Sequence, residues 1–383
     1  MQTEPPDDSA PATLTIDLGA LAANWRLLAD RAGPAECAGV IKANAYGIGD
    51  ARAAQALWVA GCRTFCVAHV SEALRVRAVV REAAIYVLNG LLPGAAPAFV
   101  AANLRPVLGS FEELDDWAVA SRAAGRRLPA AIHVDTGMNR LGFPPETLGV
   151  LANDPRLEAI EPVLLMSHLT SADEPGKPAT REQIAAFEAA RAVLPAMPAS
   201  LANSFGHHLD PVPAYEMTRP GYALYGGNPA PGQPNPMRPV VRLEARIVQT
   251  REVESGTLVG YGGVWTARGT RRLATLSVGY ADGYLRRASG TDDAGEAGAA
   301  IVAGRLCPFA GRVSMDLIVI DVSDVPEAEA RRGMPVTLIG DRLDIDEVGR
   351  RAGTIGYEIL TSLGPRYARR YVGAPEASLG RPD

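Results

Sequence analysis

The chain has 383 residues and is longer than one ordinary domain. Its length fits either one large barrel with a smaller domain or two to three medium domains. A hydrophobic content of 47% with 21% charged residues is typical of a soluble enzyme. Because nucleic-acid binders usually present a basic face, the net charge of −5 argues against a nucleic-acid partner.

The N-terminal residues 1–12 are acidic and rich in proline, which predicts a disordered tail, and they lack the basic and apolar regions of a signal peptide. No apolar run approaches the ~20 residues that a membrane span needs. The four cysteines have no repeated CxxC spacing, so we expect reduced thiols, no metal site and a cytoplasmic protein. They are Cys37, Cys62, Cys66 and Cys307.

Between about residues 38 and 226, short apolar runs alternate with alanine-rich stretches of helical spacing, which is the pattern of βα units on a parallel sheet. Helices are predicted at 51–61, 71–83, 111–125 and 181–194, with Ser71 and Ser110 as candidate N-caps. Eight runs predict a (β/α)8 barrel of the TIM type, whose active site gathers on loops at the strand C-termini. The runs are 39–42, 64–68, 84–88, 105–108, 130–135, 162–168, 199–204 and 222–226.

The segment 226–239, GGNPAPGQPNPMRP, is so rich in proline and glycine that it predicts an inter-domain linker. Alternating apolar and polar residues then predict a mainly β domain over 236–383, with short helices at 344–353 and 356–364. The barrel is expected over 13–235, and its first run, 13–18, can instead pair with the second domain. A doubly wound open sheet is the alternative, but no Rossmann glycine fingerprint follows the first barrel run.

Lysine is rare in this chain: 36 of the 38 basic residues are arginine, and the two lysines are Lys42 and Lys177. Lys42 ends the first barrel run, where its ammonium group would be partly desolvated. Desolvation lowers the pKa of a lysine and favours the neutral amine that forms Schiff bases. A strand-end lysine that reaches solvent is the other interpretation. Because arginine is otherwise used so widely, we favour a covalent role for Lys42 and assign none to Lys177.

Other polar residues follow the later runs, and the strand-end rule places them at the same pocket. Arg219 precedes the turn at Gly221 in TRPGYALYGG, and Ser204 closes LANS. Together these turns offer backbone N–H and hydroxyl donors that can hold a phosphate. Taken alone, His168 is typical of a hydrogen-bonded strand-end histidine, and the tyrosines of the second domain are typical of core residues.

Eight motifs in chain order resemble those of the bacterial alanine racemase family: VIKANAYGIG, HVDTGMNRLGF, MSH, LANS, TRPGYALYG, VGYGG, GYADGYLRR and GRVSMD. The resemblance covers residues 12–367. It implies an enzyme that uses pyridoxal 5′-phosphate (PLP), with a barrel, a C-terminal β domain and a homodimer whose active sites take residues from both subunits. The implied reaction interconverts L-alanine and D-alanine, supplies D-alanine for peptidoglycan and involves neither nucleic acid nor a membrane.

The resemblance also implies roles for single residues. Lys42 would hold PLP and act as a base on one face of the substrate Cα, and Tyr261 of the partner subunit would act on the opposite face. Arg219 would bond the pyridine nitrogen of PLP, and His168 would link Tyr261 with Arg219. The phosphate would be held by Tyr46, Ser204, Gly221, Tyr222 and Tyr357. Arg140 would bond the PLP phenolate, Arg140 and Met315 would contact the substrate, and Tyr280, Arg286, Arg312 and Asp316 would lie at the entrance or behind the site.

Two positions depart from the family pattern. Ile48 stands where many members have a histidine. His133 stands where many have a carbamylated lysine bonded to an arginine, here Arg140, so no carbamate can form. Either His133 bonds Arg140 differently, or chloride or water fills the space. The alternatives to alanine racemisation are a broad-specificity or serine racemase on the same scaffold, a non-catalytic PLP-binding protein, because a related group has the same barrel, and a Schiff-base aldolase that does without PLP.

Overall fold

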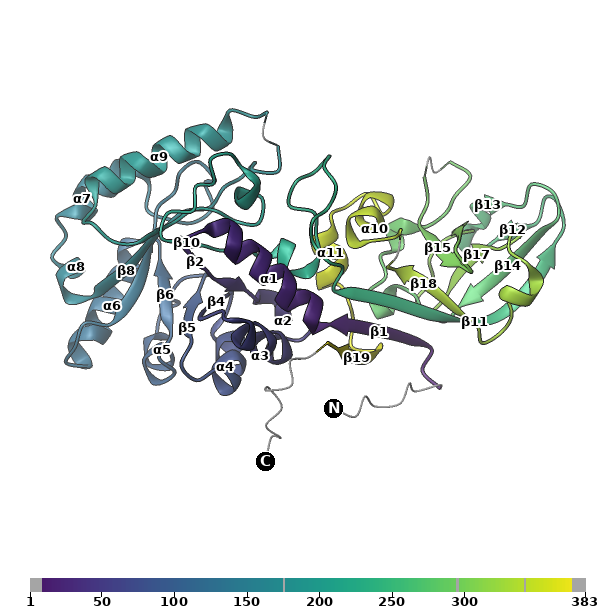
Figure 1. Ribbon diagram of the computed structural model, residues 1–383, viewed down its shortest axis with the longest axis horizontal. Helices are drawn as coiled ribbons and strands as arrows, with labels where there is room; N and C mark the ends of the chain where they lie inside the picture. Colours follow the sequence, from purple (N-terminus) through teal and green to yellow (C-terminus); the bar gives the residue numbers. More distant parts are fainter. Residues whose placement is uncertain (1–8, 175, 294–295, 341, 374–383) are drawn as a thin grey trace.

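The computed structural model describes residues 9–174, 176–293, 296–340 and 342–373, which form two domains side by side (Figure 1). The N-terminal domain is a barrel of parallel strands covered by helices, and the C-terminal domain is mainly β. This confirms the predicted fold class. Of the predicted tail, residues 1–8 lie outside the described residues, and Ala12 already belongs to the first strand.

The barrel wall is a curled parallel sheet whose seven strands pair in sequence order. All four residues of the second strand are buried, as expected where both faces of a parallel sheet are covered. The strands are short, so nearly every strand residue contributes to the core. They are β3 (Gly39–Val40), β4 (Thr64–Val67), β5 (Ala84–Val87), β6 (Arg105–Leu108), β7 (Pro129–His133), β8 (Glu161–Met166) and β9 (Ala199–Ser200).

Backbone hydrogen bonds close the ring through β10 (Met217–Thr218), which pairs in parallel with β2 (Glu36–Cys37). On the other side of β10, the N–H of Glu216 donates to the carbonyl of Ala199 at 3.1 Å. The prediction of an eighth strand at 222–226 is wrong, because those residues form the 3₁₀ helix η3 (Tyr222–Tyr225). The last strand of the ring, β10, lies earlier in the chain.

Helices follow the strands and cover the outside of the barrel (Figure 1). The four predicted helices are confirmed, and Ser110 caps its helix by accepting a hydrogen bond from the N–H of Glu113. Ser71 is not a cap, because its helix begins one residue earlier and is capped at His69. The barrel helices are α1 (Leu18–Ala32), α3 (Asp50–Ala60), α4 (Val70–Val79), α5 (Ala96–Ala101), α6 (Phe111–Ala123), α7 (Leu148–Ala152), α8 (Arg156–Ala159) and α9 (Ala179–Val193).

The second domain is built around one long strand, β11 (Val241–Val253), whose first residues alternate between buried and half-buried. It pairs with three other strands, and two short helices follow the sheet, as predicted. The other elements are β12 (Leu258–Val259), β13 (Trp265–Thr266), β14 (Arg271–Leu276), β15 (Ala299–Val302), β16 (Arg305–Pro308), β17 (Ile318–Asp321), β18 (Pro335–Ile339), α10 (Ile345–Arg351), α11 (Gly356–Thr361) and β19 (Ala368–Val372).

The first strand of the chain belongs to the sheet of the second domain. β1 (Ala12–Asp17) lies between β11, with which it runs antiparallel, and β19, with which it runs parallel. Its residues alternate between buried and half-buried, because one face of the strand packs into the core. Asp17 then caps α1 by accepting a hydrogen bond from the N–H of Ala20 at 2.9 Å. The chain therefore crosses from the second domain into the barrel without a loop.

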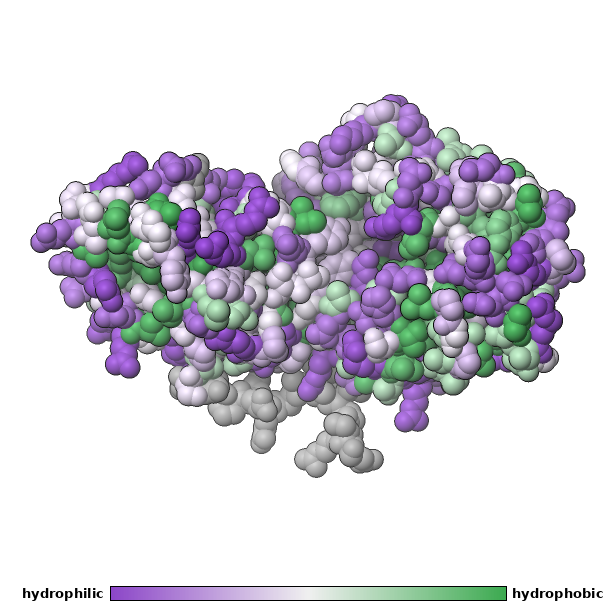
Figure 2. Space-filling view, turned by 180° about the vertical axis from the view of Figure 1, so that it is seen from behind, coloured by the Kyte–Doolittle hydropathy of each residue, from purple (hydrophilic) through white to green (hydrophobic). Residues whose placement is uncertain are grey.

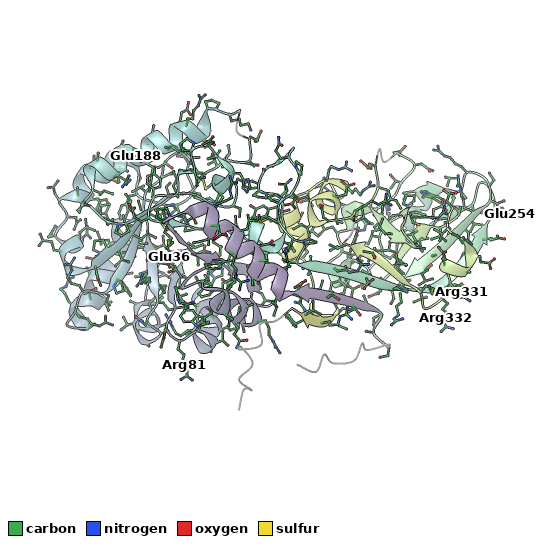
Figure 3. The ribbon with its side chains drawn as sticks, in the orientation of Figure 1. Glu36, Arg81, Glu188, Glu254, Arg331 and Arg332 are labelled. Carbon is green, nitrogen blue, oxygen red and sulfur yellow. The ribbon has the colours of Figure 1, made fainter. Side chains whose placement is uncertain are left out.

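Seen from behind, the molecule has two lobes with a waist between them, and hydrophilic and hydrophobic residues are interspersed over both (Figure 2). Charged side chains such as Arg81, Arg331 and Arg332 point away from the body of the protein (Figure 3). The described part of the chain contains no helix with the length and apolarity that crossing a bilayer requires.

Candidate active site

A left-handed turn, α2 (Lys42–Tyr46), follows the first barrel strand. The φ angles of Ala43, Asn44, Ala45 and Tyr46 are 54°, 55°, 52° and 50°. A left-handed helical conformation costs roughly 1–2 kcal/mol for each residue other than glycine, so contacts from elsewhere in the fold must hold the turn. The turn places Lys42 at its start, just past the end of the strand.

Glu72, from α4, fixes this turn to the next strand of the barrel. Its Oε1 accepts a hydrogen bond from the N–H of Ala43 at 2.7 Å. Its Oε2 accepts from the N–H groups of Ala68 and His69 at 2.7 and 3.2 Å. Glu72 could not be connected with Lys42 from the sequence, because the contact joins separate βα units. The one available signal was an acidic residue in the first turn of the helix that follows the second barrel strand.

The amine of Lys42 lies in a setting that favours its neutral form. Burial lowers the pKa of Lys42, and the positive charge of Arg140 lowers it further, whereas the carboxylate of Glu72 acts in the opposite direction. A lysine with a lowered pKa supplies more of the uncharged amine that attacks carbonyl carbons. This agrees with the covalent role expected for Lys42, and Lys177 instead forms an exposed ion pair with Glu174 at 2.6 Å.

Arg219 is a buried cation whose contacts within the described residues are with neutral oxygens. Its guanidinium donates to the hydroxyl of Ser200 and to the backbone carbonyl of Ser167. Burial lowers the pKa of Arg219 to about 10, and its side chain is only 4% exposed. A guanidinium is a hydrogen-bond donor without acceptor capacity. Arg219 can therefore donate to a ring nitrogen at the barrel mouth and leave that nitrogen without a proton.

Two histidines lie at the same end of the barrel. His133 ends β7, and His168 follows β8. Burial lowers the pKa of His133 to about 4 and that of His168 to about 3, and the charges of Arg219 and Arg140 act in the same direction on both. These electrostatic interactions indicate that four predicted residues lie close together: His133, His168, Arg140 and Arg219. Both imidazoles are neutral near pH 7, so each has one nitrogen that can accept a hydrogen bond.

The turn after β10 forms a cradle of donors around Ser204. The hydroxyl oxygen of Ser204 accepts hydrogen bonds from the N–H groups of Gly221 and Ala223 at 3.0 and 3.1 Å. Gly221 is required here, because a Cβ at this position would lie 2.4 Å from the phenol oxygen of Tyr46. A hydroxyl with converging backbone N–H groups is a common way to hold an anion.

Four tyrosine rings, termed here the tyrosine row, lie beside this cradle. Tyr225 stacks on Tyr46 with ring centroids 4.5 Å apart, and Tyr46 meets Tyr357 at 5.9 Å. Tyr357 stacks on Tyr222 at 4.0 Å with an angle of 9° between the ring planes. Burial raises the pKa of Tyr46 and of Tyr357 above the usual value for tyrosine, so both phenols remain proton donors. The row brings Tyr357, from α11 of the second domain, to the mouth of the barrel.

The other residues expected from the second domain lie on its surface. Tyr261 lies between β12 and β13 and is 68% exposed. Met315 and Tyr280 are 53% and 42% exposed. Their segments are joined by backbone hydrogen bonds such as that from the N–H of Tyr280 to the carbonyl of Ser314. Within one chain, the structure therefore does not bring Tyr261 to Lys42.

Three more of the predicted residues are charged side chains of the second domain. Arg312 follows Gly311, and a Cβ at Gly262 would lie 3.0 Å from its Nη1, so Arg312 lies against the hairpin that carries Tyr261. Asp316 forms an ion pair with Arg366 at 2.8 Å, and Arg286 is exposed at the start of a 3₁₀ helix.

Comparison with known proteins accounts for this set of residues. The family models described as "Alanine racemase, N-terminal domain" and "Alanine racemase, C-terminal domain" match residues 16–229 and 240–371. The chain belongs to the alanine racemase family. The enzyme class predicted from the motifs is thereby confirmed.

Relatives within the alanine racemase family cover nearly the whole chain. An alanine racemase of Methylobacterium nodulans is 61% identical over 94% of this chain and 96% of its own length. A catabolic alanine racemase of Mesorhizobium japonicum is 50% identical over 95% of this chain and 94% of its own length. A solved structure of the Bartonella henselae alanine racemase, with covalently bound PLP, has a TM-score of 0.90 and 39% identity, covering 95% of this chain and all (100%) of that one.

The alanine racemase family depends on PLP, and the residues at the barrel mouth fit this cofactor. The turn around Ser204 suits a phosphate, and the guanidinium groups of Arg140 and Arg219 supply positive charge at the same end of the barrel. The lowered pKa of Lys42 suits a covalent link to an aldehyde. The predicted cofactor is thus supported both by the family and by the chemistry of the site.

Proposed function

We propose that this alanine racemase family member interconverts L-alanine and D-alanine with PLP held by Lys42, and that two bases move the proton. The observation that carries the proposal is the position of Lys42, a largely buried amine whose pKa burial and the charge of Arg140 lower, at the start of a turn whose Tyr46 lies against the Gly221 turn that surrounds Ser204. Supporting it, the chain is 61% identical to an alanine racemase over nearly its whole length.

The cofactor supplies the electron withdrawal that makes the α-proton of the amino acid removable. Lys42 removes or returns that proton on one face, and Tyr261 from a second copy of the chain does so on the other. Two groups on opposite faces invert the carbon, because the proton that leaves on one side is replaced from the other. Each such transfer contributes roughly 10²- to 10⁴-fold to the rate.

Arg219 donates a hydrogen bond to the pyridine nitrogen and keeps that nitrogen unprotonated, because even its lowered pKa of about 10 leaves the guanidinium charged near pH 7. This limits electron withdrawal and disfavours side reactions. Tyr46, Ser204, Gly221, Tyr222 and Tyr357 hold the phosphate. Arg140 and Met315 contact the phenolate and the substrate, while Tyr280, Arg286, Arg312, Asp316, His133 and His168 shape the entrance and support the site.

The proposal requires a homodimer. Tyr261, Tyr280 and Met315 are exposed on the second domain, and exposed aromatic and methionine side chains are enriched in protein interfaces. A second copy of the chain that covers this surface would supply Tyr261 to the site built around Lys42. The two sites of such a dimer would each contain residues of both subunits.

We propose further that the protein is cytoplasmic and supplies D-alanine for peptidoglycan. The catabolic alanine racemase of Mesorhizobium japonicum shows that the family also includes members with another physiological role. A broad-specificity or serine racemase is the second candidate, because His133 and Ile48 alter the surroundings of Arg140 and of the lysine turn. The match of the second domain to the family argues against a non-catalytic PLP-binding protein.

The decisive experiment is a racemisation assay with chiral detection. Purified protein supplied with PLP is incubated with each of a panel of L-amino acids, and the D-enantiomer is measured. D-alanine should form fastest. Preferential formation of another D-amino acid would support the broad-specificity candidate, and no racemisation of any substrate would refute the proposed function.

A further inference from the structure

A hydrogen bond crosses between the two domains beside the phosphate cradle. The phenol of Tyr222, in η3 of the barrel, donates to Oδ1 of Asp346 at 2.6 Å, and Asp346 lies in α10 of the second domain. The other carboxylate oxygen, Oδ2, accepts from the backbone N–H of Asn228 at 2.9 Å. Both oxygens of Asp346 therefore hold the chain segment that follows the cradle.

Two glycines leave room for the Tyr222 side chain. A Cβ at Gly227 would lie 2.1 Å from Cε1 of the ring, and a Cβ at Gly356 would lie 1.8 Å from the phenol oxygen. Neither glycine has a positive φ, so conformational freedom does not explain them. One glycine comes from the barrel and the other from α11. The two domains are thus shaped around the phenol of Tyr222.

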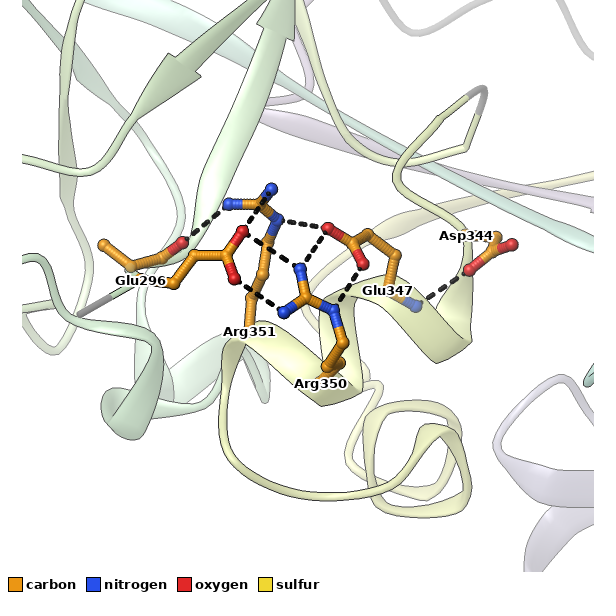
Figure 4. Close-up of polar contacts among 6 residues, drawn as sticks. Glu296, Asp344, Glu347, Arg350 and Arg351 are labelled. Atoms are coloured by element: carbon orange, nitrogen blue, oxygen red, sulfur yellow. Dashed lines mark hydrogen bonds and ion pairs between the residues drawn. The ribbon is translucent and has the colours of Figure 1, made fainter. Parts of the chain in front are cut away.

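The helix that carries Asp346 is itself anchored. Asp344 caps α10 by accepting from the N–H of Glu347 at 2.8 Å. Behind the cap, the guanidinium of Arg350 binds both Glu296 and Glu347, and Arg351 binds the same two carboxylates (Figure 4). These ion pairs hold α10 against Glu296 of the second domain. Asp346 therefore contacts the barrel from a helix, α10, that is itself held in place.

The stacked rings connect the hydrogen bond between Tyr222 and Asp346 with the phosphate cradle. The ring of Tyr222 lies nearly parallel to that of Tyr357, and Tyr357 in turn meets Tyr46. Fixing the phenol of Tyr222 fixes the plane of its ring, and the 4.0 Å stack then restricts where Tyr357 can lie. The backbone N–H groups that begin η3 are held by the same residue, because Tyr222 lies between Gly221 and Ala223.

We propose that Tyr222 and Asp346 are positioning residues for the phosphate of the cofactor: their hydrogen bond sets the cradle of η3 and the ring of Tyr357 across the domain boundary. This inference rests on the proposed use of PLP. It adds the side chain of Tyr222, and the whole of Asp346, to the residues on which phosphate binding depends. It also makes the second domain of each chain a part of that chain's own cofactor site.

The test compares two probes that differ only in the phosphate. Full-length Tyr222→Phe and Asp346→Ala proteins, freed of cofactor, are titrated with PLP and with pyridoxal, and the absorbance of the bound form gives each dissociation constant. Each variant should bind PLP about 10-fold more weakly than the wild type, and pyridoxal as tightly as the wild type does. Tyr284→Phe, which alters a buried tyrosine of the second domain outside the tyrosine row, should change neither value.

The double variant adds a second readout. If the phenol and the carboxylate act through one bond, Tyr222→Phe with Asp346→Ala should weaken PLP binding by the same factor as either change alone. Equal weakening of PLP and pyridoxal, unchanged PLP binding, or fully additive effects would each overturn the inference. Circular dichroism of every variant confirms that it is folded before titration. A wild type that binds neither probe would instead refute the proposed cofactor, which keeps the two failures distinct.

Discussion

The carboxylate of Glu72 lies 2.7 Å from the backbone nitrogen of Ala43, the residue that follows Lys42. This contact joins the lysine turn to the next βα unit through a side chain that is only 7% exposed. It explains how a turn of the unfavourable hand is maintained in a stretch without glycine. The position of Lys42 therefore depends on a residue from a different strand and helix.

Replacing Glu72 with alanine should destabilise the protein and loosen the turn that positions Lys42. The change leaves the N–H groups of Ala43, Ala68 and His69 without their acceptor, which should lower the free energy of unfolding by about 1–3 kcal/mol. Urea unfolding of the full chain measures this loss. Glu82→Ala, at an exposed turn, is the control and should unfold like the wild type. Equal stability of the two variants would show that Glu72 does not hold the turn.

The two lysines offer a matched pair of substitutions. Lys42→Arg keeps a positive charge but cannot form the covalent link to PLP, so kcat/KM should fall by at least about 10³-fold. Lys177→Arg should leave activity unchanged, because its exposed pair with Glu174 can form with arginine as well. Racemisation assays give the rates, and borohydride reduction with peptide mass spectrometry locates the cofactor. Finding the cofactor on Lys177 would reverse the assignment.

Mixing two inactive variants tests whether sites are shared. Lys42→Ala and Tyr261→Phe should each be nearly inactive as homodimers. A mixed dimer, however, contains one site with both wild-type residues, so random reassortment should restore about a quarter of wild-type activity. The measurement is racemase activity after the two proteins are unfolded and refolded together. Activity that stays at the level of the separate variants would place Tyr261 outside the partner's site.

Acid should weaken the fold through histidines that burial keeps neutral. Burial lowers the pKa from 6.5 to about 4 for His133 and to about 3 for His168 and His207. Below pH 6.5 the unfolded chain binds protons at these positions while the folded chain does not. The free energy of unfolding should therefore fall as the pH drops from 6.5 towards 3, by up to about 1.4 kcal/mol per pH unit for each histidine.

His207→Leu isolates one of these contributions. The residue is fully buried, and within the described residues neither of its ring nitrogens has a hydrogen-bond partner. The variant should be at least as stable as the wild type at pH 7 and should show a shallower loss of stability between pH 6.5 and 4. An unchanged slope in His207→Leu would remove this histidine from the acid response.

The elements with strong periodicity could be predicted from the sequence. In helix α9 and strand β11, buried residues recur with the period expected for a helix and a strand. The bounds of α9 agree with the predicted 181–194 within two residues at each end. Helix α1 was missed, because Asp17 ends β1 and caps α1 at once and no turn residue marks the change. The eighth strand was misplaced because the tyrosines of η3 have high β-propensity.

The features of the candidate site likewise include some that could be predicted from the sequence and some that could not. Lys42 and Arg219 could be found because a strand-end rule and local motifs point to them. The left-handed conformation at Ala43 could not be predicted, because Glu72 and the packing of Tyr46 on Tyr225 impose it. Neither contact is between neighbours in the sequence. Contacts between distant segments leave no periodic trace in a single sequence, so they become visible only in the folded chain.

The place of β1 in the second sheet has a consequence for synthesis on the ribosome. Leu14 pairs with Leu243 on one side and with Arg369 on the other. During synthesis β1 must therefore wait for β11 before one of its edges can pair, and for β19, made more than a hundred residues later, before the other edge can pair. Nascent chains of this protein thus carry an unpaired edge of β1 until β19 has been made, and chaperones that shield such edges should affect its yield more than its final stability.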